Sequence, residues 1–576
     1  MTALKLQLIE PQQNTETLRE QLEAELNECT EANATGKNHV RNFMVANGIW
    51  HISELNYPLR KQFEALLQEK YSDNACRKYL LAYDRIKQYS ISKELQIFTK
   101  GKHQNSQYRN EIFYLPYYPD SELNGQFLNI VKKEILIWDF TIDVAEVMKR
   151  QIFTILCDMV RTQRRRQSLT EKLSALLDVY HYCCDEAIED IEQMELEQAQ
   201  KFTTVSTHSY DKGIIEYCRK ILFLQSEEIP WQAPVWYLER FHLQPERTDP
   251  SNPVRRISFL EVTNRRNRSI LQKYFRYALG VTNLSIGNIR SEHNYVRNFL
   301  VWLNQPEDLD ICSAATEQID GYFKELQQKS LLAASYNDQV MAILHFFNFL
   351  LVRKYIERIP FSEDLYLKKE IPVHHNRSVE QEVAREILSK LYRFPEEIRL
   401  IYLHLWAVGL RISEICSLKG NAYYVQGRDA WIQVYQNKMR NYKRIPIPTA
   451  LYKLMQVYLK KHQIKSDDYV FQNQKGGAYR SATFRWKMKE CCRENNIQYG
   501  EYIFQCHDYR HTVATNFYDT GVSIQSVRDY LGHSYEEMTQ QYLDHMPKKI
   551  DKANEEYFSQ HKSLAAGLLK KGGDKK

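Results

Sequence analysis

The stretch from His507 to Tyr542 constrains the chain most, because it crowds basic and aromatic side chains into short helical segments. His507 and Arg510 lie three residues apart, so a helix presents both on one face. A second helical pattern follows, and Gly532 can end it because glycine readily adopts the left-handed conformation after a helix. His533 and Tyr542 lie nine residues apart. Guanidinium, imidazole and phenol groups gathered in this way suit an attack on a phosphodiester.

Composition supports a polyanionic partner for this region. The net charge of the 576 residues is only +6, but residues 401–500 carry 17 Lys or Arg against 6 Asp or Glu. A basic region of this size suits nucleic acid, although solvated faces produce similar counts. Eleven scattered cysteines without CxxC spacing favour neither a disulfide framework nor a zinc site. The longest apolar run, 398–410, is too short to span a bilayer. We therefore expect a soluble, cytoplasmic, nucleoid-associated protein without membrane contact.

Helical periodicity dominates the chain, and the expected fold class is mainly α and multidomain. A C-terminal mixed α/β domain, made of helices with a small antiparallel sheet, follows helical modules. The prolines of 231–257 indicate a loop or linker. The expected division is an N-terminal helical module at 1–100, a helical middle region with the Pro-rich linker at 101–285, a helical module at 286–365, a C-terminal domain at 375–560 and a basic disordered tail at 561–576.

A short sequence repeat links two of these modules. NHVRNFMV at 38–45 matches NYVRNFLV at 294–301 in six of eight positions. A duplication would make the two segments helical modules of one kind. A match this short also arises by chance, so the sequence leaves both explanations open.

The C-terminal domain shows clear local signals. A buried helix is expected over 398–408, where Gly409 can break it, and Ser413 is placed to cap the next helix. Alternating residues in 431–435 and 444–448 predict a β-hairpin, with Lys438 and Arg440 in its turn.

Three blocks then line up in order: GLRISEICSL around Arg411, the hairpin lysine Lys438, and the array HxxRH, LGH and Tyr542. Together they resemble the tyrosine recombinase family, of the phage-integrase type, over roughly residues 375–560. The module at 286–365 resembles the core-binding domain that precedes such catalytic domains. The long N-terminal region is more similar to large recombinases encoded by transposons and other mobile elements.

The resemblance implies a site-specific recombinase, an integrase or transposase, that cleaves and rejoins DNA through a 3′-phosphotyrosine intermediate. Planar guanidinium groups match the charge that develops on phosphoryl oxygens. The implied catalytic residues are the clamps Arg411 and Arg510, the nucleophile Tyr542, the proton acceptor His507, the hydrogen-bond donor His533 and the general acid Lys438. Glu414 is expected to support the pocket. The phosphotyrosine conserves the bond energy, so no cofactor, ATP or metal is expected.

The remaining basic residues are candidates for DNA contact: Arg297, Arg440, Lys443 and Arg444. Arg440 and Lys443 also compete with Lys438 for the role of general acid, because all three lie on the hairpin. The implied partners are double-stranded DNA at specific sites, a homotetramer in the synaptic complex and other element-encoded recombination proteins.

Two other functions stay open on sequence grounds. A type IB topoisomerase-like enzyme shares this chemistry but relaxes DNA without exchanging partners. A catalytically silent DNA-binding accessory protein is disfavoured because every reactive position is filled. A zinc-binding helix built on His507 and His511 is disfavoured because Asp508, and not Glu, follows the first histidine.

Overall fold

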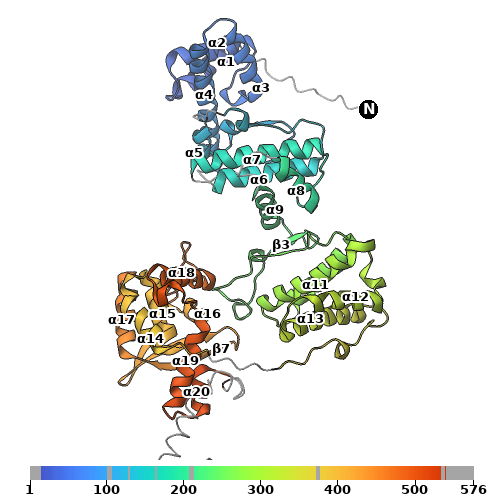
Figure 1. Ribbon diagram of the computed structural model, residues 1–576. Coiled ribbons are helices and arrows are strands. Elements are labelled where there is room, and N and C mark those ends of the chain that lie inside the picture. The colour runs from blue at the N-terminus through green and yellow to red at the C-terminus, as the bar shows by residue number, and fades with distance from the viewer. Residues whose placement is uncertain are drawn as a thin grey trace, which may run out of the picture. The chain divides into compact units, whose positions relative to one another are not determined.

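The structure is a computed structural model that describes residues 15–99, 107–127, 130, 132–162, 165–205, 213–371, 377–533 and 539. It is mainly helical with small sheets, which confirms the predicted fold class. The chain divides into two compact units, 1–240 and 241–576 (Figure 1). Across the described ranges, no helix is both long enough and apolar enough to cross a bilayer.

Unit 1 begins with a four-helix module. Its helices are α1 (Thr15–Glu28), α2 (Ala34–Ala46), α3 (Tyr57–Gln68) and α4 (Asp73–Thr99). The apolar spacing seen in the sequence becomes the buried face, where Val40, Met44 and Phe63 pack together. The long α4 packs against both α2 and α3.

The rest of unit 1 is a helical layer beside a short antiparallel ribbon. The ribbon pairs β1 (Ile112–Tyr114) with β2 (Ile137–Asp139). The helices are α5 (Ser121–Asn124), α6 (Glu146–Thr162), α7 (Arg166–Asp185), α8 (Leu196–Val205) and α9 (Ile214–Gln225). The buried Trp138 joins the ribbon to the core of α6 and α7. The segment 231–257, expected as a loop or linker, holds β3 (Val235–Tyr237) at the end of unit 1 and the start of β4 (Arg256–Ser258), which belongs to unit 2.

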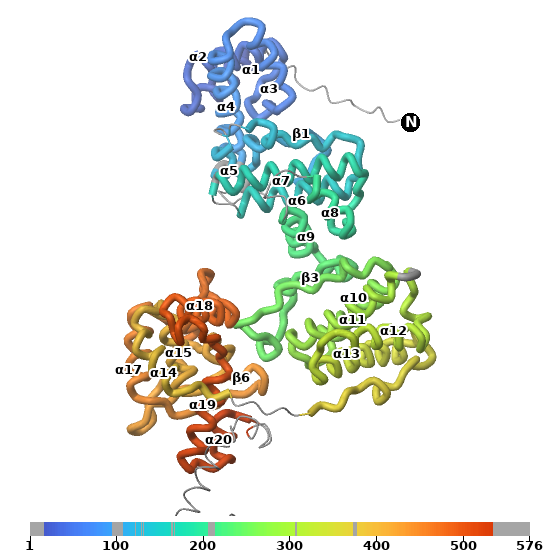
Figure 2. Tube along the Cα trace, viewed as in Figure 1, coloured from blue at the N-terminus to red at the C-terminus, as the bar shows by residue number. Residues whose placement is uncertain are grey.

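Unit 2 opens with a second four-helix module, seen in yellow-green in Figure 2. Its helices are α10 (Arg265–Gly280), α11 (Ile286–Glu307), α12 (Thr316–Gln328) and α13 (Ala333–Val352). Both α10 and α13 pack against α11.

The C-terminal part of unit 2 surrounds a three-stranded antiparallel sheet with helices. The strands, in spatial order, are β5 (Tyr423–Gln426), β6 (Asp429–Gln436) and β7 (Asn441–Ile447). The helices are α14 (Gln381–Lys390), α15 (Glu396–Val408), α16 (Ile412–Cys416), α17 (Thr449–Lys461), α18 (Ser481–Glu494), α19 (Cys506–Asp519) and α20 (Ile524–Leu531). α15 packs against α19, which brings residues about a hundred positions apart into one core.

The local signals in this domain were mostly correct. Gly409 ends α15 at φ 68°, and a Cβ there would lie 3.0 Å from Cβ of Val513, so the turn needs glycine. The hairpin is confirmed by the pairing of β6 with β7. The cap predicted at Ser413 is wrong. The N-cap of α16 is Arg411, whose backbone N–H is held by the Glu414 carboxylate instead.

Candidate active site

Arg411 and Glu414 form the first half of the site, at the turn between α15 and α16. The Glu414 carboxylate accepts a hydrogen bond from the Arg411 backbone N–H (3.0 Å) and one from its Nη1 (2.8 Å). Only 2% of the Glu414 side chain is exposed. Burial alone would raise its pKa, but the charges of Lys443, Arg510 and Arg411 lower that pKa to about 2. Glu414 is therefore an anion that orients the Arg411 guanidinium.

Arg510 forms the second half, on α19, and is almost fully buried. Its Nη1 donates to the Gly409 carbonyl (3.0 Å), and its Nη2 donates to the Leu531 carbonyl (2.7 Å). These bonds tie the ends of α15 and α20 to α19. Because both carbonyls belong to the turns that end helices, helix termini fix the guanidinium in place.

His533 directly follows the Gly532 cap of α20 and contacts this guanidinium. Its Nε2 lies 2.9 Å from Nη2 of Arg510, and its Nδ1 lies 3.0 Å from Oγ1 of Thr539. Burial, together with the charges of Arg510, Arg411 and Lys443, lowers the pKa of His533 to about 3. The imidazole is therefore neutral near pH 7.

His507 lies one turn before Arg510, in the first turn of α19, and is more exposed than its neighbours. Its ring meets that of His511 edge to face, with centroids 5.2 Å apart. Partial burial lowers the pKa of His507 to about 4, and the charges of His511, Arg510 and Arg411 contribute. A neutral imidazole at this position can accept a proton.

Lys443 enters the site from β7. Its Nζ lies 3.7 Å from Oε2 of Glu414 and 3.3 Å from the Leu531 carbonyl oxygen. Only 9% of the side chain is exposed. Burial and the two arginines lower the pKa of Lys443 to about 8, while Glu414 opposes that shift. Gln436 on β6 completes the cluster, because its Nε2 lies 3.4 Å from Glu414 Oε1 and from the Leu531 carbonyl.

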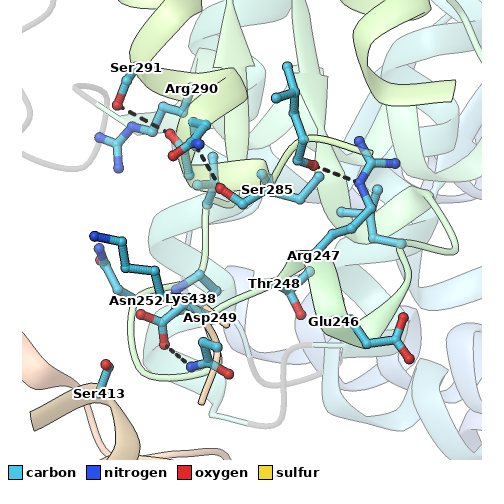
Figure 3. A pocket seen from close by; sticks show the side chains of 18 of the residues that line it. Glu246, Arg247, Thr248, Asp249, Asn252, Ser285, Arg290, Ser291, Ser413 and Lys438 are labelled. Carbon is cyan, nitrogen blue, oxygen red and sulfur yellow. Dashed lines mark hydrogen bonds between the residues drawn. The ribbon is translucent and has the colours of Figure 1, made fainter. Parts of the chain in front are cut away.

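Lys438 and Arg440 occupy a different place, in the turn between β6 and β7. They line a cavity of about 700 Å³ together with residues of 243–254 and 283–294 (Figure 3). Arg440 donates to the side-chain oxygen (2.6 Å) and the backbone carbonyl of Asn283. Within the part of the chain that the structure describes, no hydrogen bond or ion pair joins Lys438 to the cluster around Glu414.

The other predicted residues are scattered. Arg444 lies on the exposed face of β7 and donates to Gln433 (3.1 Å). Arg297 lies on α11 and pairs with Glu261 at 3.2 Å. Tyr542 lies outside the described residues.

Lys443, predicted as a DNA contact, lies beside the buried carboxylate of Glu414, which was not predicted. The sequence nevertheless contains a pattern that indicates an inward-facing Lys443. Residues two apart on a strand share a face, and Lys443 shares its face with the buried Ile445 and Ile447. Gln436 carries the same signal, because it shares the buried face of β6 with Ile432 and Val434. Thr539, whose partner His533 lies six residues earlier, carries no such signal.

Comparison with known proteins is consistent with this geometry. The family model described as the phage integrase family matches residues 377–549. Transposase B from transposon Tn554 of Staphylococcus aureus is 26% identical over 359 residues, which cover 60% of this chain. The chain spans only 56% of the length of that transposase. Tyrosine recombinase XerC of Bacillus pumilus is 26% identical over 255 residues, covering 42% of this chain and 79% of the recombinase.

The chain is also similar to solved structures of DNA-bound integrases. The Tn1549 transposon integrase in complex with transposon right end DNA is 18% identical and has a TM-score of 0.37. That match covers 50% of this chain and 98% of the integrase. A lambda integrase dimer bound to a core site is 16% identical with a TM-score of 0.38, covering 48% and 95% of the two chains. Residues 377–549 of this chain therefore match the phage integrase family, and the similar curated proteins are a transposon transposase and a tyrosine recombinase.

Proposed function

We propose that this protein is a site-specific DNA recombinase, an integrase or transposase of a mobile element, that acts through a 3′-phosphotyrosine intermediate. The observation that carries the proposal is the convergence of Arg411, Arg510 and Lys443 on the single buried carboxylate of Glu414. Three cations against one anion leave the pocket with a positive charge that a phosphodiester would neutralise.

The chemistry follows from the groups present. Arg411 and Arg510 bind the non-bridging oxygens of the scissile phosphate, and their charge stabilises the transition state. The phenolic oxygen of Tyr542 attacks phosphorus and forms the 3′-phosphotyrosine bond while the bond to the 5′ oxygen breaks. A phenol has a pKa of about 10, so it must lose its proton to a base, for which the neutral His507 is suited. Lys438 gives a proton to the departing 5′ oxygen, which balances the step.

His533 changes partner in this scheme. Its Nε2 now accepts from Arg510, so it cannot donate there at the same time. When a phosphoryl oxygen takes over the Arg510 hydrogen bond, Nε2 can carry the proton and donate to that oxygen. The hydroxyl of Thr539 can then donate to Nδ1, because a hydroxyl both donates and accepts.

The proposed partner is duplex DNA bearing the recombination site, with four subunits assembled on two duplexes. A nicked suicide substrate, made from the ends of the element that carries the gene, tests the chemistry. Wild type should become covalently attached to this DNA, and Tyr542→Phe should not. A two-site recombination assay beside a supercoil-relaxation assay then separates partner exchange from simple relaxation. Relaxation without recombinant product would reject the recombinase in favour of a topoisomerase.

A further inference from the structure

The two four-helix modules carry the repeated octapeptide at the same place in the fold. NHVRNFMV lies in α2 and NYVRNFLV lies in α11, each the second helix of its module (Figure 2). In each module this helix packs against the first and the fourth helices, α1 and α4 in one case and α10 and α13 in the other. The six identical residues of the octapeptide therefore lie in helices that have the same neighbours in the two modules.

The cores of the two modules are also built alike. The Phe43 ring lies 5.1 Å from the Phe63 ring on the third helix and 6.4 Å from the Tyr83 ring on the fourth. In the second module, Phe299 lies 5.0 Å from Tyr322 on the third helix and 6.2 Å from Phe347 on the fourth. In both modules, an aromatic ring on the second helix therefore contacts aromatic rings on the third and the fourth helices.

Two further correspondences extend the match. The third helices have their N-caps at Asn56 and Ala315, and the buried Leu67 and Leu326 follow each cap at the same distance of eleven residues. The repeated arginine is paired in both modules. Arg41 contacts Glu23 on the first helix at 3.0 Å, and Arg297 contacts Glu261, just before the first helix, at 3.2 Å. In both modules the second helix therefore packs against the first and the fourth, and its repeated arginine is paired with a glutamate. The third helices differ, because α3 packs mainly against α4 whereas α12 packs mainly against α11.

The surfaces of the first helices differ. α10 carries five Lys or Arg and no acidic residue, whereas α1 carries five Glu and one Arg. Three of these glutamates are engaged within the module: Glu23 with Arg41, Glu25 with His51 and Glu28 with Lys93. Residues 15–99 together have 11 Lys or Arg against 12 Asp or Glu. Any attraction for a polyanion must therefore come from a local patch away from α1.

Such a patch lies where α2 meets the start of α4. The rings of His39, Tyr71 and Tyr79 contact one another, with centroids 4.1 to 5.3 Å apart, and Tyr71 is 39% exposed. The exposed Lys70 and Lys78 each precede one of the tyrosines, and neither forms an ion pair within the described residues. We call these five residues the Tyr71 patch. Ammonium groups neutralise phosphates, and phenol hydroxyls donate to them.

We infer that residues 15–99 are a duplicated copy of the module at 265–352 and form a second DNA-binding module, which contacts the backbone of duplex DNA through the Tyr71 patch. The inference rests on the proposed function, which supplies the DNA. The second module would bind sequence flanking the site of cleavage. The protein would then need more DNA for full affinity than its catalytic step requires.

The test uses the full-length protein and two duplexes, a short one with the cleavage site alone and a long one with its flanks. Lys70→Gln/Lys78→Gln removes two phosphate contacts. On the long duplex it should lower the slope of log affinity against log salt by about 2 and erase the outer part of the footprint. Affinity for the short duplex and covalent capture on it should stay unchanged, because neither lysine belongs to the catalytic machinery.

Lys132→Gln/Lys133→Gln is the matched control, since both lysines are exposed and lie in the same unit. It should behave as wild type on both duplexes. The inference is overturned if the Lys70/Lys78 variant matches this control on the long duplex, or if wild type protects no flanking DNA. It is equally overturned if the variant loses only a protein–protein complex. Failure of wild type to become covalently attached to the short suicide substrate would instead reject the proposed function.

Discussion

Nη2 of Arg510 donates to Nε2 of His533 across 2.9 Å, so the histidine accepts from a permanent cation. A ring nitrogen that accepts carries no proton, which leaves Nδ1 as the protonated nitrogen of a neutral ring. Protonating Nε2 would break this bond and place a second positive charge against the guanidinium. The contact therefore makes the site sensitive to acid.

Folding stability should fall as the pH drops below about 6.5. The folded-state pKa values of His533 and His507 are lowered to about 3 and about 4, so the unfolded chain binds protons that the folded chain does not. Stability from these groups is complete above pH 6.5 and is lost as the pH falls toward 3. Glu414, whose pKa is lowered to about 2, acts in the same direction below about pH 4.5.

Replacing one histidine measures how much that histidine contributes to the pH dependence of the unfolding free energy. His533→Gln keeps an acceptor for Arg510 but cannot titrate, so its unfolding free energy should depend less steeply on pH between 6.5 and 4 than that of wild type. Urea unfolding at several pH values measures the difference. His242→Gln, at an exposed position, should retain the wild-type slope. Equal slopes in His533→Gln and wild type would contradict a neutral, buried His533.

Glu414 should matter to stability more than any cation that surrounds it. Glu414→Gln leaves Arg411, Arg510 and Lys443 facing one another without an anion, and we expect a loss of about 3 to 5 kcal/mol. Lys443→Met removes one of those cations and fills its space with an apolar chain. That change should cost less than about 1 kcal/mol, because Glu414 keeps Arg411 and Arg510 as cationic neighbours and the penalty for burying the Lys443 charge is removed.

The double variant tests this coupling. Lys443→Met in the Glu414→Gln background should recover part of the lost stability, because it relieves repulsion among the remaining cations. Urea unfolding of the four proteins gives the coupling energy. Additive losses in the double variant would mean that Lys443 and Glu414 do not interact in the folded state.

Much of the fold and part of the site follow from sequence alone. The helix before Gly409 was predictable because an apolar run ended at a residue that tolerates positive φ. The hairpin was predictable from its alternating residues. The N-cap of α16 was misassigned to Ser413, because the carboxylate of Glu414 competes for the same helix start. Residue preferences favour Ser413 over Arg411 as a cap, because they do not include the hydrogen bond from the Arg411 backbone N–H to the Glu414 carboxylate.

Long-range contacts explain the rest. Lys443 reaches Leu531, 88 residues away, and no local pattern encodes that meeting. The short strands in 231–257 were missed because four prolines there favoured a loop. The repeat at 38–45 and 294–301 was detectable in the amino-acid sequence. The support for a duplication comes from the matching ring contacts of Phe43 and Phe299, which only the three-dimensional structure shows.

Lys438 and Lys443 can be distinguished by the leaving group. If Lys438 protonates the 5′ oxygen, Lys438→Ala should slow cleavage by about 10² to 10⁴-fold. A substrate with sulfur in place of that oxygen should restore the rate, because a thiol with a pKa of about 8.5 leaves as the thiolate without a proton donor. Lys443→Met should slow cleavage without such rescue, since it acts on phosphate charge and on Glu414. Sulfur rescue of Lys443→Met alone would instead make Lys443 the general acid.

A comparison of alanine variants at Gly532 and Gly521 distinguishes the cost of backbone strain from an effect on the active site. It adopts φ 69°, and a Cβ there would lie 2.5 Å from the Gln436 amide that contacts Glu414. Gly521 adopts φ 88° with no atom within 4 Å of its Cβ position. Gly532→Ala and Gly521→Ala should therefore each lose roughly 1 to 2 kcal/mol of stability from the left-handed backbone. Only Gly532→Ala should also slow covalent capture on the suicide substrate, by about 10²-fold, because displaced Gln436 shifts the groups that orient Arg411. Equal capture rates in the two variants would show that Gln436 does not position the site.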